Sequence, residues 1–369
     1  MEMVEFYKPL RLSAKRLDRY LAGGWFRSSN GLFRNQILCL DGQLCTVVNI
    51  RLPLRNLRFG KSQRKILNRS RRCTIEIAPL RIDEELDALY QLTKSRFKGF
   101  VFPNLSSFLY DFFDRAIFKS FTVRVYHEGK LIAASVFDCG EKSIMSVLGI
   151  YDPEYSDWSP GKLTMLLEIQ WAMQNGFHHY YPGYVLHESR SFDYKTSLGK
   201  YQFLGAKNRW TYDYQKAIQA SPVAEINAKS KILEEALHEL NIPCKRLLYK
   251  LFSLGYAYEE GSFVRYPIIF VLPELSENPF KICLAAYHLE SDSYHISQPI
   301  PVHDEFLAAH QSLEFQNADV YYDLVLQDNL EDRFEYASAK QLAQNFHALW
   351  SKRGNRSGLK SMALGKFTS

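Results

Sequence analysis

The chain has 369 residues, with 46% hydrophobic and 23% charged side chains and a formal net charge of +6, which leaves room for two or three domains. No apolar run approaches the roughly 20 residues that a membrane-spanning helix needs, and charged residues interrupt the only N-terminal segment that resembles a secretion signal. The six cysteines lie far apart, which indicates thiols in a reducing cytoplasm rather than a disulfide framework. Composition therefore excludes membrane-spanning and disulfide-rich classes and predicts a soluble, cytoplasmic α/β protein.

The first 50 residues contain a short basic helix candidate at 13–21, followed by a strand-like segment. Cys39 and Cys45 in that segment have five residues between them, whereas the paired thiolates of a metal site usually have two to four. Cys73 could supply a third ligand, but no fourth is evident nearby. We predict ordinary half-buried thiols and no bound metal, with a metal or iron–sulfur site as the alternative.

The segment 51–72 is the most charged part of the chain, with nine basic residues and no acidic one. A solvated helix face usually mixes both signs, because like charges at helical spacing repel each other. A run of one sign with Ser, Gln and Asn between the charges suits a phosphate backbone, so we predict that this segment binds nucleic acid. The alternative is a basic surface without a ligand. The predicted contacts are Arg55, Lys61, Gln63, Arg64, Lys65 and Arg69.

Apolar patterning then predicts a strand at 73–77, a helix from about Asp83 and a further helical patch at 107–113. The first turn of the helix at Asp83 is acidic, as the helix dipole favours. These elements precede the region 121–203, which has the clearest order of elements in the chain.

In the region 121–203, two apolar runs flank a turn at 128–130, which predicts a β-hairpin, and a third strand is expected at 143–151. Ser159, expected to be an N-cap hydroxyl and followed by proline, begins a helix of about four turns, and a strand resumes at 178–185. The order is hairpin, strand, helix and strand, with a right-handed crossover before the last strand. This order indicates the core of an acyl-transfer fold.

The start of this helix is a candidate anion site. Its free N–H groups around Ser159 and Gly161, and the positive end of its dipole, would face the diverging strands. Acetyltransferases of this fold hold coenzyme A at a glycine-rich helix start, whereas this chain has one glycine there. We therefore predict no cofactor.

The segment 180–184 reads Tyr-Tyr-Pro-Gly-Tyr at the end of a strand. It would place phenolic hydroxyls at the rim of a cleft, and packing tyrosines are the alternative in a chain that has 23 of them. Tyr194 and Lys195 follow on a loop, where Asp193 adds a carboxylate close to the ammonium. A lone histidine such as His127 is more often structural than a base, and no Ser/His/Asp or Cys/His order indicates a covalent mechanism.

After residue 205 the pattern changes to a second, smaller α+β region that is acidic around 304–335. The tail from Arg353 is rich in Gly, Ser and Lys and is expected to be disordered. Helices are expected at 225–240, 245–254, 304–311 and 337–350, and strands at 266–272, 282–289, 294–296 and 320–326.

A series of short motifs runs through residues 20–205. They are Gly24-Trp25-Phe26-Arg27, Pro53-Leu54-Arg55, Ser62-Gln63-Arg64, the hairpin residues Gly129, Leu131, Ile132 and Ala133 closing on Asp138, Tyr151-Asp152-Pro153, Gly161 with Glu168-Ile169, Tyr181 with Gly183-Tyr184, and Tyr194-Lys195. In this order the motifs resemble those of the arginyl-tRNA–protein transferase family, including its bacterial leucyl-transferring relatives. Several motifs in the right order are more specific than any one of them.

The resemblance implies that an amino acid, arginine or leucine, is transferred from aminoacyl-tRNA to the N-terminal residue of an acceptor protein, which marks that protein for degradation (an N-degron). It also implies an acyl-CoA N-acyltransferase (GNAT)-like mixed sheet with flanking helices, with the basic segment holding the tRNA acceptor arm. The donor ester is already activated, so positioning, oxyanion stabilisation and removal of the amine's proton can suffice. The expected partners are aminoacyl-tRNA and the acceptor N-terminus, with no membrane.

The transfer site implied by the resemblance is lined by Asp138 and by groups from 181 to 195. Tyr126 and His127 are added because they precede the hairpin turn, and Asp138 or His127 is expected to accept the proton. The expected catalytic residues are Tyr126, His127, Asp138, Tyr181 and Tyr184, and the expected substrate-binding residues are Ser159, Gly161, Gly183, Tyr194 and Lys195.

The predicted divisions are a basic, cysteine-bearing region at 1–80, a GNAT-like catalytic core at 81–205, an α+β extension at 206–352 and a disordered tail at 353–369. Two alternatives for the function stay open. One is an acyl-CoA-dependent N-acyltransferase with the same fold, and the other is a non-catalytic relative that binds tRNA or protein.

Overall fold

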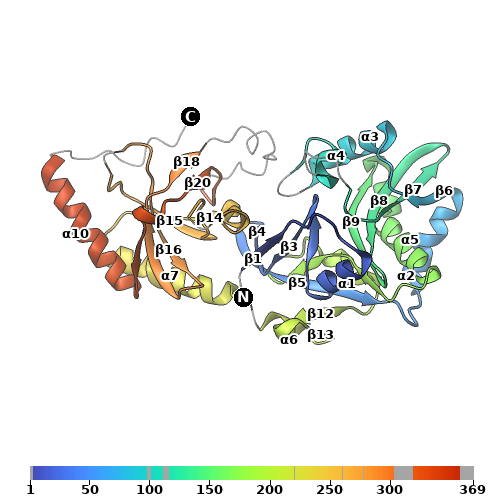
Figure 1. Cartoon of the computed structure of the whole chain (residues 1–369), viewed down its shortest axis with the longest axis horizontal. Helices are drawn as coiled ribbons and strands as arrows, with labels where there is room; N and C mark the ends of the chain where they lie inside the picture. The colour runs from blue at the N-terminus through green and yellow to red at the C-terminus, as the bar shows by residue number, and fades with distance from the viewer. Residues whose placement is uncertain are drawn as a thin grey trace. The chain divides into compact units, whose positions relative to one another are not determined.

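The computed structural model describes residues 3–97, 101–110, 116–219, 221–259, 261–276, 278–302 and 319–357. The chain divides into two compact units, with the described residues before Pro222 in the first unit and those from Pro222 onward in the second (Figure 1). Both units combine helices with β-sheets, so the predicted mixed α/β class is confirmed. Within the described ranges, no helix has the length and apolar content needed to cross a membrane.

A ten-stranded sheet forms the centre of the first unit. Its main path runs β13-β12-β5-β10-β9-β8-β7-β6, and the short strands β4 and β11 pair with β5 beside that path. The β9–β10 pair is parallel, whereas the other pairs are antiparallel. The strands are β4 (Ile37–Leu40), β5 (Gln43–Pro53), β6 (Thr74–Pro79), β7 (Ser120–His127), β8 (Lys130–Cys139), β9 (Ser143–Tyr151), β10 (His179–Tyr181), β11 (Tyr184–Leu186), β12 (Gln202–Gly205) and β13 (Arg209–Thr211).

The predicted β-hairpin is confirmed as β7 and β8. They are joined by a two-residue turn at Glu128 and Gly129, whose φ angles of 51° and 80° are both positive, as a type I′ hairpin turn requires. The strand predicted at 143–151 is confirmed as β9 with the same bounds.

The helix after β9 is confirmed, but its predicted N-cap is wrong. α5 (Pro160–Gln174) begins with proline at its first position and ends at Asn175. Ser159 has left-handed backbone angles (φ 56°, ψ 51°), and its side chain makes no capping hydrogen bond. The residue instead ends the 3₁₀ helix η3 (Pro153–Trp158), where its N–H donates to the carbonyl of Ser156 at 3.0 Å. This left-handed turn between the two helices takes the place of a side-chain cap.

The strand predicted at 178–185 is divided in two. β10 ends at Tyr181, since Pro182 has no N–H to donate and Gly183 takes a positive φ of 100°. The chain then joins β5 as β11, with Tyr184 opposite Asn49. The two halves of the predicted strand therefore pair with different neighbours.

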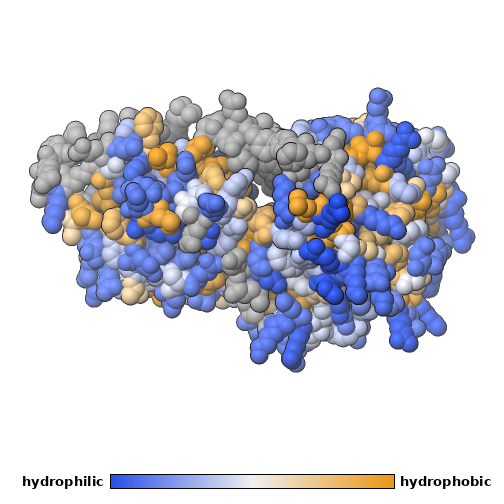
Figure 2. Space-filling model, in the orientation of Figure 1, coloured by the Kyte–Doolittle hydropathy of each residue, from blue (hydrophilic) through white to orange (hydrophobic). Residues whose placement is uncertain are grey.

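Helices cover both faces of this sheet. α5 and α2 (Lys61–Arg69) lie side by side on one face (Figure 1), where Leu166 and Ile169 are fully buried. The opposite face is covered by α1 (Ala14–Ala22), α3 (Glu84–Thr93), α4 (Leu105–Leu109) and a small sheet of β1 (Val4–Tyr7), β3 (Gly31–Asn35) and β2 (Phe26–Ser28). Figure 2 shows apolar side chains scattered among hydrophilic ones on the viewed face, as is usual for globular proteins.

Three local predictions in the first unit are confirmed. α1 and β6 lie where a helix at 13–21 and a strand at 73–77 were expected. α3 starts after Asp83, whose carboxylate accepts a hydrogen bond from the N–H of Leu86 at 3.0 Å. The helical patch expected at 107–113 is the short α4, and residues 111–115 lie outside the described ranges.

The second unit has a six-stranded sheet in the order β19-β14-β15-β16-β17-β21. The helices expected at 225–240 and 337–350 are confirmed as α7 (Val223–Glu239) and α10 (Ala339–Ser357), which pack against each other and against this sheet. α10 continues into the segment that was expected to be a tail. The remaining strands are β14 (Lys245–Tyr249), β15 (Ile268–Leu272), β16 (Cys283–His288), β17 (Ser293–Ser297), β18 (Ile300–Val302), β19 (Tyr321–Tyr322), β20 (Val325–Gln327) and β21 (Phe334–Tyr336).

The helix predicted at 245–254 is wrong over its first half. That half is β14, which lies between β15 and β19 and buries Leu247, Leu248 and Tyr249. A strand inside a sheet buries consecutive side chains on both faces, so its apolar run cannot be told from that of a buried helix by spacing alone. The strands expected at 266–272, 282–289 and 294–296 are confirmed, the one expected at 320–326 is divided into β19 and β20, and the helix expected at 304–311 lies outside the described residues.

Candidate functional site

The parallel strands β9 and β10 diverge after a short ladder. Their pairing runs only from His179 opposite Ser143 to Tyr181 opposite Met145. β9 then continues to its end at Tyr151, whereas the residues after β10 turn away from β9 and pair with β5 as β11. Gly149 is exposed as a result, although β9 is an inner strand of the sheet. We call this region, between β9 from Ser146 onward and the chain after β10, the β9–β10 opening.

The start of α5 borders this opening at the far end of β9. A Cβ atom added to Gly161 would lie 3.8 Å from the ring of Tyr151, the last residue of β9. The phenol of Tyr194 is also close, because Tyr151 adds to the effect of burial in raising the pKa of Tyr194. The structure thus brings two predicted substrate-binding residues, Gly161 and Tyr194, to one end of the opening, next to Ser159 in the chain.

Lys195 connects the other predicted residues of the opening. Its Nζ lies 3.4 Å from the carbonyl oxygen of Tyr184 and 3.1 Å from the position of a Cβ on Gly183. It also lies above the rings of Phe192 and Tyr184, 4.8 and 5.4 Å from their centroids. Burial lowers the pKa of Lys195 to about 8. Among the described residues no carboxylate forms an ion pair with this ammonium.

Tyr181 is buried below the same region. Its phenol lies 3.4 Å from Nη1 of Arg51, and the Arg51 guanidinium stacks on Trp210 at 4.5 Å. Tyr181 is 1% exposed, so it packs beneath the residues of the opening and does not line its surface. Arg51 and Trp210 were not among the predicted site residues, and the signal for Arg51 was its membership of the basic segment.

Three predicted catalytic residues are each held by contacts with other side chains, although Asp138 lies opposite Met145 at one end of the opening and His127 lies 4.9 Å from the ring of Trp158, next to Ser159, at the other. Asp138 is fully buried, and both of its carboxylate oxygens accept hydrogen bonds from Arg27, at 2.9 and 3.1 Å. Tyr126 donates to Glu85 at 3.1 Å, and His127 contacts Tyr155 through Nδ1 at 3.4 Å. The hairpin register places Tyr126 opposite residue 131, so about 23 Å of strand separate it from Asp138.

The predicted nucleic-acid residues lie on and before α2. Gln63 closes the start of this helix by accepting from the N–H of Gly60, and it donates to the carbonyl of Ser197, two residues after Lys195. Arg69 donates to the carbonyl of Asp157, just before the start of α5. α2 therefore lies along one side of the β9–β10 opening.

The basic surface of α2 is exposed and unpaired. We define it by the four exposed residues Arg55, Lys61, Arg64 and Lys65. Arg64 donates to the carbonyl of Phe59 at 2.6 Å, and none of the four forms an ion pair with a described carboxylate. Unneutralised charges of one sign attract a polyanion more than a surface of mixed charge does.

Sequence reasoning missed one polar residue in α5. Glu168 is fully buried among the apolar residues of this helix, and the Tyr180 hydroxyl donates to its Oε2 at 2.7 Å. Burial raises the pKa of Glu168 to about 7. An acid between Leu167 and Ile169, in the mostly apolar middle of the helix, was the signal that could have found it.

The cysteines do not form a metal site in the described part of the chain. Cys39 and Cys45 lie on the paired strands β4 and β5, and burial raises the pKa of Cys45 to about 11, which keeps it protonated. No group of three or more His, Cys, Asp and Glu side chains among the described residues could hold a metal ion.

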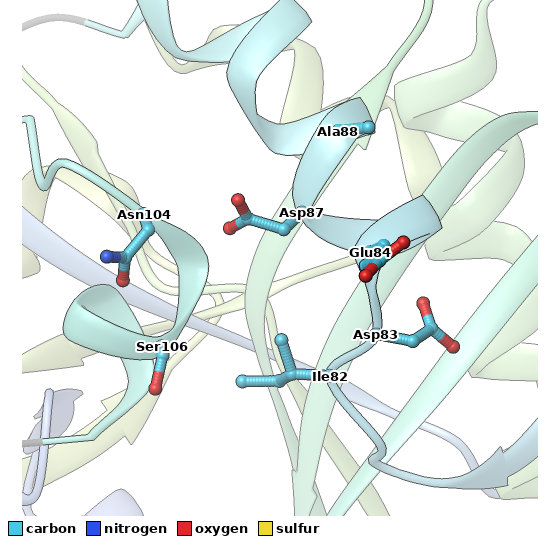
Figure 3. Close-up of a pocket in the computed structure, with 7 residues that line it drawn as sticks. All are labelled: Ile82, Asp83, Glu84, Asp87, Ala88, Asn104 and Ser106. Atoms are coloured by element: carbon cyan, nitrogen blue, oxygen red, sulfur yellow. The ribbon is translucent and has the colours of Figure 1, made fainter.

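Figure 3 shows an acidic pocket between α3 and α4, lined by Ile82, Asp83, Glu84, Asp87, Ala88, Asn104 and Ser106. Asp83 and Asp87 already accept hydrogen bonds from the N–H groups of Leu86 and Leu105. Asp83 is the N-cap of α3 and Asp87 binds the first N–H of α4, so two of the three carboxylates in the pocket have a structural role at helix starts.

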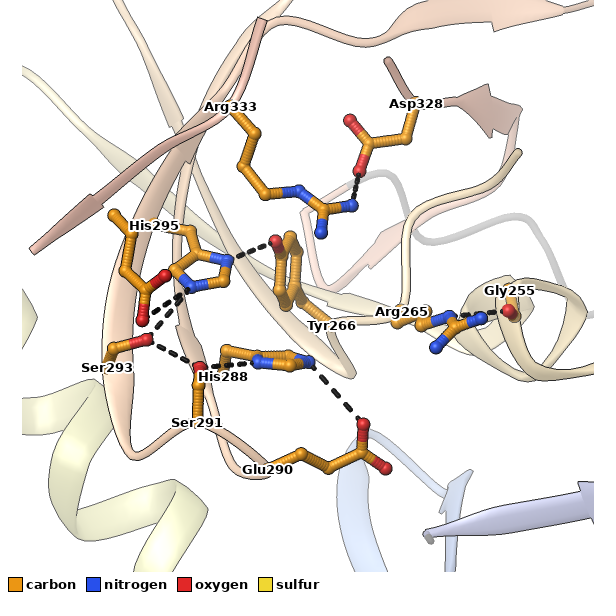
Figure 4. A network of polar contacts seen from close by, with 11 residues as sticks. Gly255, Arg265, Tyr266, His288, Glu290, Ser291, Ser293, His295, Asp328 and Arg333 are labelled. Carbon is orange, nitrogen blue, oxygen red and sulfur yellow. Dashed lines mark hydrogen bonds and ion pairs between the residues drawn. The ribbon is translucent and has the colours of Figure 1, made fainter. Parts of the chain in front are cut away.

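The second unit contains a polar network on β16 and β17 (Figure 4). Nδ1 of His295 lies 2.7 Å from the hydroxyl of Tyr266, and Nε2 lies 2.9 Å from that of Ser293. The ring of His288 stacks on that of His295 at 4.9 Å. Burial lowers the pKa of His295 to about 4, so this imidazole is neutral at physiological pH.

Residues 86–205 match the family model described as "Arginine-tRNA-protein transferase, C terminus". The chain is 26% identical over 218 residues to the aspartate/glutamate leucyltransferase of Leptospira interrogans, which covers 56% of this chain and 83% of that protein. It is 40% identical over 74 residues to arginyl-tRNA–protein transferase 1 of Saccharomyces cerevisiae, which covers 20% of this chain and 15% of that protein. The solved structure of L-PGS from Bacillus licheniformis matches with a TM-score of 0.32 and 18% identity, over 48% of this chain and about half (52%) of that one. The family model and the two relatives confirm the resemblance predicted from the motifs.

Proposed function

We propose that this relative of the arginine-tRNA-protein transferases moves an amino acid, arginine or leucine, from charged tRNA to the N-terminal amine of an acceptor protein. The observation that carries the proposal is the β9–β10 opening, which brings Gly183, Tyr184 and Lys195 together beside the basic helix α2. Two relatives are named as a leucyltransferase and an arginyl-tRNA–protein transferase, which supports an aminoacyltransferase activity. We place the reaction in the cytoplasm, where charged tRNA is found, and we expect its product to be an N-degron.

The arrangement around the opening supports a GNAT-like core. Two parallel strands joined by a helix separate after three residue pairs, and the helix starts where they are apart. An ester carbonyl and an amine can meet between such strands, where α5 offers free N–H groups beside Gly161 to an anionic group of a substrate. Holding the two reactants in this way supplies much of the rate enhancement that an activated ester needs.

Lys195 suits stabilisation of the charge that develops during the transfer. Attack on the ester turns its carbonyl oxygen into an oxyanion, which a nearby ammonium stabilises. With a pKa of about 8, lowered by burial, Lys195 still carries its charge at pH 7. The exposed phenol of Tyr194 is then placed to contact a substrate, and Tyr181 with Arg51 supports the site from below.

Replacing Gly183 with alanine is expected to lower the rate of transfer by about 10- to 100-fold, because the new Cβ would lie 3.1 Å from Nζ of Lys195 and displace the ammonium. The matched control is Gly176→Ala, since Gly176 also has a positive φ (76°) but nothing within 4 Å of an added Cβ. Both variants should lose about 1–2 kcal/mol of stability from left-handed strain. Single-turnover rates with charged tRNA and a peptide test this, and equal rate losses in both variants would contradict the role of Lys195.

The basic surface of α2 is expected to bind tRNA through phosphate contacts. Replacing Arg55, Lys61 and Lys65 with glutamine should weaken tRNA binding by about tenfold or more and should flatten its salt dependence by about 0.7–0.9 in slope for each phosphate that is no longer bound. Fluorescence anisotropy with labelled tRNA at several salt concentrations measures both quantities. The control variant removes the same number of exposed charges from the second unit, at Lys231, Lys340 and Lys352. An affinity that does not change with salt would contradict the binding of tRNA through its phosphates.

The function itself is tested by transfer of labelled amino acid from a complete set of charged tRNAs onto peptides that begin with Asp, Glu or Ala. Acetyl-coenzyme A serves as a parallel donor. We expect label on the acidic peptides, and the tRNA that supplies it identifies the amino acid. Acetylation without aminoacyl transfer would assign the protein to the acyl-CoA-dependent enzymes. Inactivity with both donors, together with tight tRNA binding, would favour a non-catalytic tRNA-binding relative.

A further inference from the structure

Glu168 on α5 is a fully buried acid with no cation to balance its charge. The Tyr180 hydroxyl donates a hydrogen bond to its Oε2 at 2.7 Å. Among the described residues, no Lys, Arg or His forms an ion pair with it. Burying an acid without a charged partner costs stability, so packing alone does not explain this residue.

The polar groups around Glu168 have unused hydrogen-bonding capacity. Its Oε1, the hydroxyl of Ser135 and the hydroxyl of Tyr201 are all buried and make no close hydrogen bond among the described residues. Ser135 nevertheless lies near enough to the carboxyl of Glu168 to contribute to lowering its pKa. Burial raises the pKa of Cys139, the thiol facing Glu168 from β8, to about 12, and it raises that of Tyr180 well above 10. Of these titratable groups, only Glu168 changes its charge near neutral pH.

This cluster lies at the closed end of the β9–β10 opening. The last pair of the ladder is Met145 with Tyr181, so Ser146 is the first residue of β9 beyond the pairing. Ser146 is half-buried and follows Ile144 by two residues on β9, so its side chain lies on the face of the sheet that α5 covers, where it contributes to lowering the pKa of Glu168. Ser146 therefore connects the opening with a carboxyl group that solvent does not reach.

We propose that Glu168 is the proton acceptor of the transfer reaction and that it receives the proton of the acceptor amine through the hydroxyl of Ser146. The inference rests on the proposed function. An N-terminal amine has an ordinary pKa of about 8, so it arrives mostly as an ammonium and must lose a proton before its nitrogen can attack. The ammonium gives that proton to Oγ of Ser146, while the hydroxyl proton of Ser146 passes to the Glu168 carboxylate.

The remaining bonds and protons then balance. The free nitrogen forms a bond to the ester carbonyl carbon, and the bond between that carbon and the ribose oxygen of the tRNA breaks. The ribose oxygen takes the second proton of the amine, and Glu168 later releases its proton to solvent. Glu168 acts through Ser146 without touching the substrate, so it is a positioning and proton-accepting residue, and it replaces Asp138 and His127 as the expected proton acceptor.

The experiment measures kcat against pH with saturating peptide and charged tRNA for the wild-type chain and for Glu168→Gln. Glutamine keeps an oxygen that can accept from Tyr180, so a structural role would survive the substitution. We expect kcat to fall by about 100-fold, since general-base catalysis contributes about 10²–10⁴-fold. We also expect the decrease of kcat toward low pH, the acidic limb of the pH profile, to disappear. A kcat within about twofold of wild type, or an unchanged acidic limb, would overturn the proposal.

A second pair of variants tests the direction of the effect. Tyr180→Phe removes a hydrogen bond that lowers the pKa of Glu168, so the acidic limb should move upward by about half to one pH unit. Tyr201→Phe is the matched control, because the hydroxyl of Tyr201 acts on Tyr180 but not on Glu168 and makes no hydrogen bond among the described residues, so the acidic limb of this variant should stay in place. A limb that stays in place in Tyr180→Phe, or moves equally in both, would overturn the relay.

The failure of the relay and the failure of the proposed function give different results. If the wild-type chain transfers from charged tRNA but Glu168→Gln behaves like it, the relay alone is overturned. If the wild-type chain transfers nothing from any charged tRNA, the proposed function is overturned, and the relay with it. Infrared titration of the carboxyl band without substrates adds a second readout, because a band that is absent in Glu168→Gln should titrate near pH 7 in the wild type.

Discussion

Replacing Asp138 with asparagine is expected to lower the free energy of unfolding of the first unit by about 3–5 kcal/mol. Asp138 and Arg27 form an ion pair with side chains that are 0% and 2% exposed. Without the carboxylate, the Arg27 guanidinium keeps its bonds to the carbonyls of Ser29 and Leu109, but its buried charge has no counter-charge. Urea titration followed by tryptophan fluorescence measures the loss, because four of the five tryptophans belong to the first unit.

A double variant separates the ion pair from the size of its side chains. Replacing Asp138 with leucine together with Arg27 with methionine removes both charges, and it should recover most of the lost stability. The exposed pair of Lys231 and Glu235, 3.8 Å apart on α7, is the control, since its removal should cost less than about 1 kcal/mol. If Asp138→Asn kept its unfolding free energy and lost only kcat, Asp138 would be a catalytic group as first expected, and the structural assignment would be wrong.

The case of Asp138 shows which site predictions sequence patterns support. Its place at the end of β8 followed from the hairpin, because the turn at Glu128 and Gly129 fixes the register locally. Its partner Arg27 lies 111 residues earlier in the chain, on another sheet. Spacing within one segment contains no information about such a contact, so a buried ion pair and a catalytic carboxylate have the same appearance in the sequence.

The residues that the structure does bring together were predictable for a related reason. Gly183 and Lys195 lie on the same stretch of chain after β10, before and after β11, and Pro182-Gly183 marks in the sequence the point where the strand must leave its neighbour. Tyr126 and His127, by contrast, were chosen by their closeness to the hairpin turn. That turn lies just before the first residue of β8, whereas Asp138 lies near the last one, so the length of the strand separates them.

Glu168 was missed because helix patterns are usually interpreted by their apolar residues. α5 has almost no polar face, so every position in its middle is buried and an acid there has no exposed side to occupy. The family motif contains this residue, but spacing alone gave it no chemical role. Only the end of the β9–β10 ladder at Met145 and Tyr181 shows that the acid lies beside an opening.

The second unit is expected to lose about 3 kcal/mol of stability between pH 7 and pH 4 through the titration of His295. An unfolded histidine binds a proton at about pH 6.5, whereas burial lowers the pKa of His295 in the folded state to about 4. Between these values the unfolded chain binds more protons than the folded one, so stability is complete above about pH 6.5 and falls as the pH decreases. The neighbouring charges of Arg333 and His288 act in the same direction as burial, while Glu335 opposes them.

Hydrogen exchange followed by mass spectrometry measures this loss locally, in peptides from β16 and β17 after correction for intrinsic rates. In the wild-type chain the protection of these strands should fall as the pH decreases from 7 to 4.5, while His295→Gln should be less protected at pH 7 and show little further change. His238→Gln, on the exposed side of α7, controls for the loss of one imidazole. An equal pH dependence in wild type and His295→Gln would assign the acid sensitivity to carboxylates instead. The predicted difference follows from the hydroxyls of Tyr266 and Ser293, which hold both ring nitrogens where water cannot stabilise a positive charge.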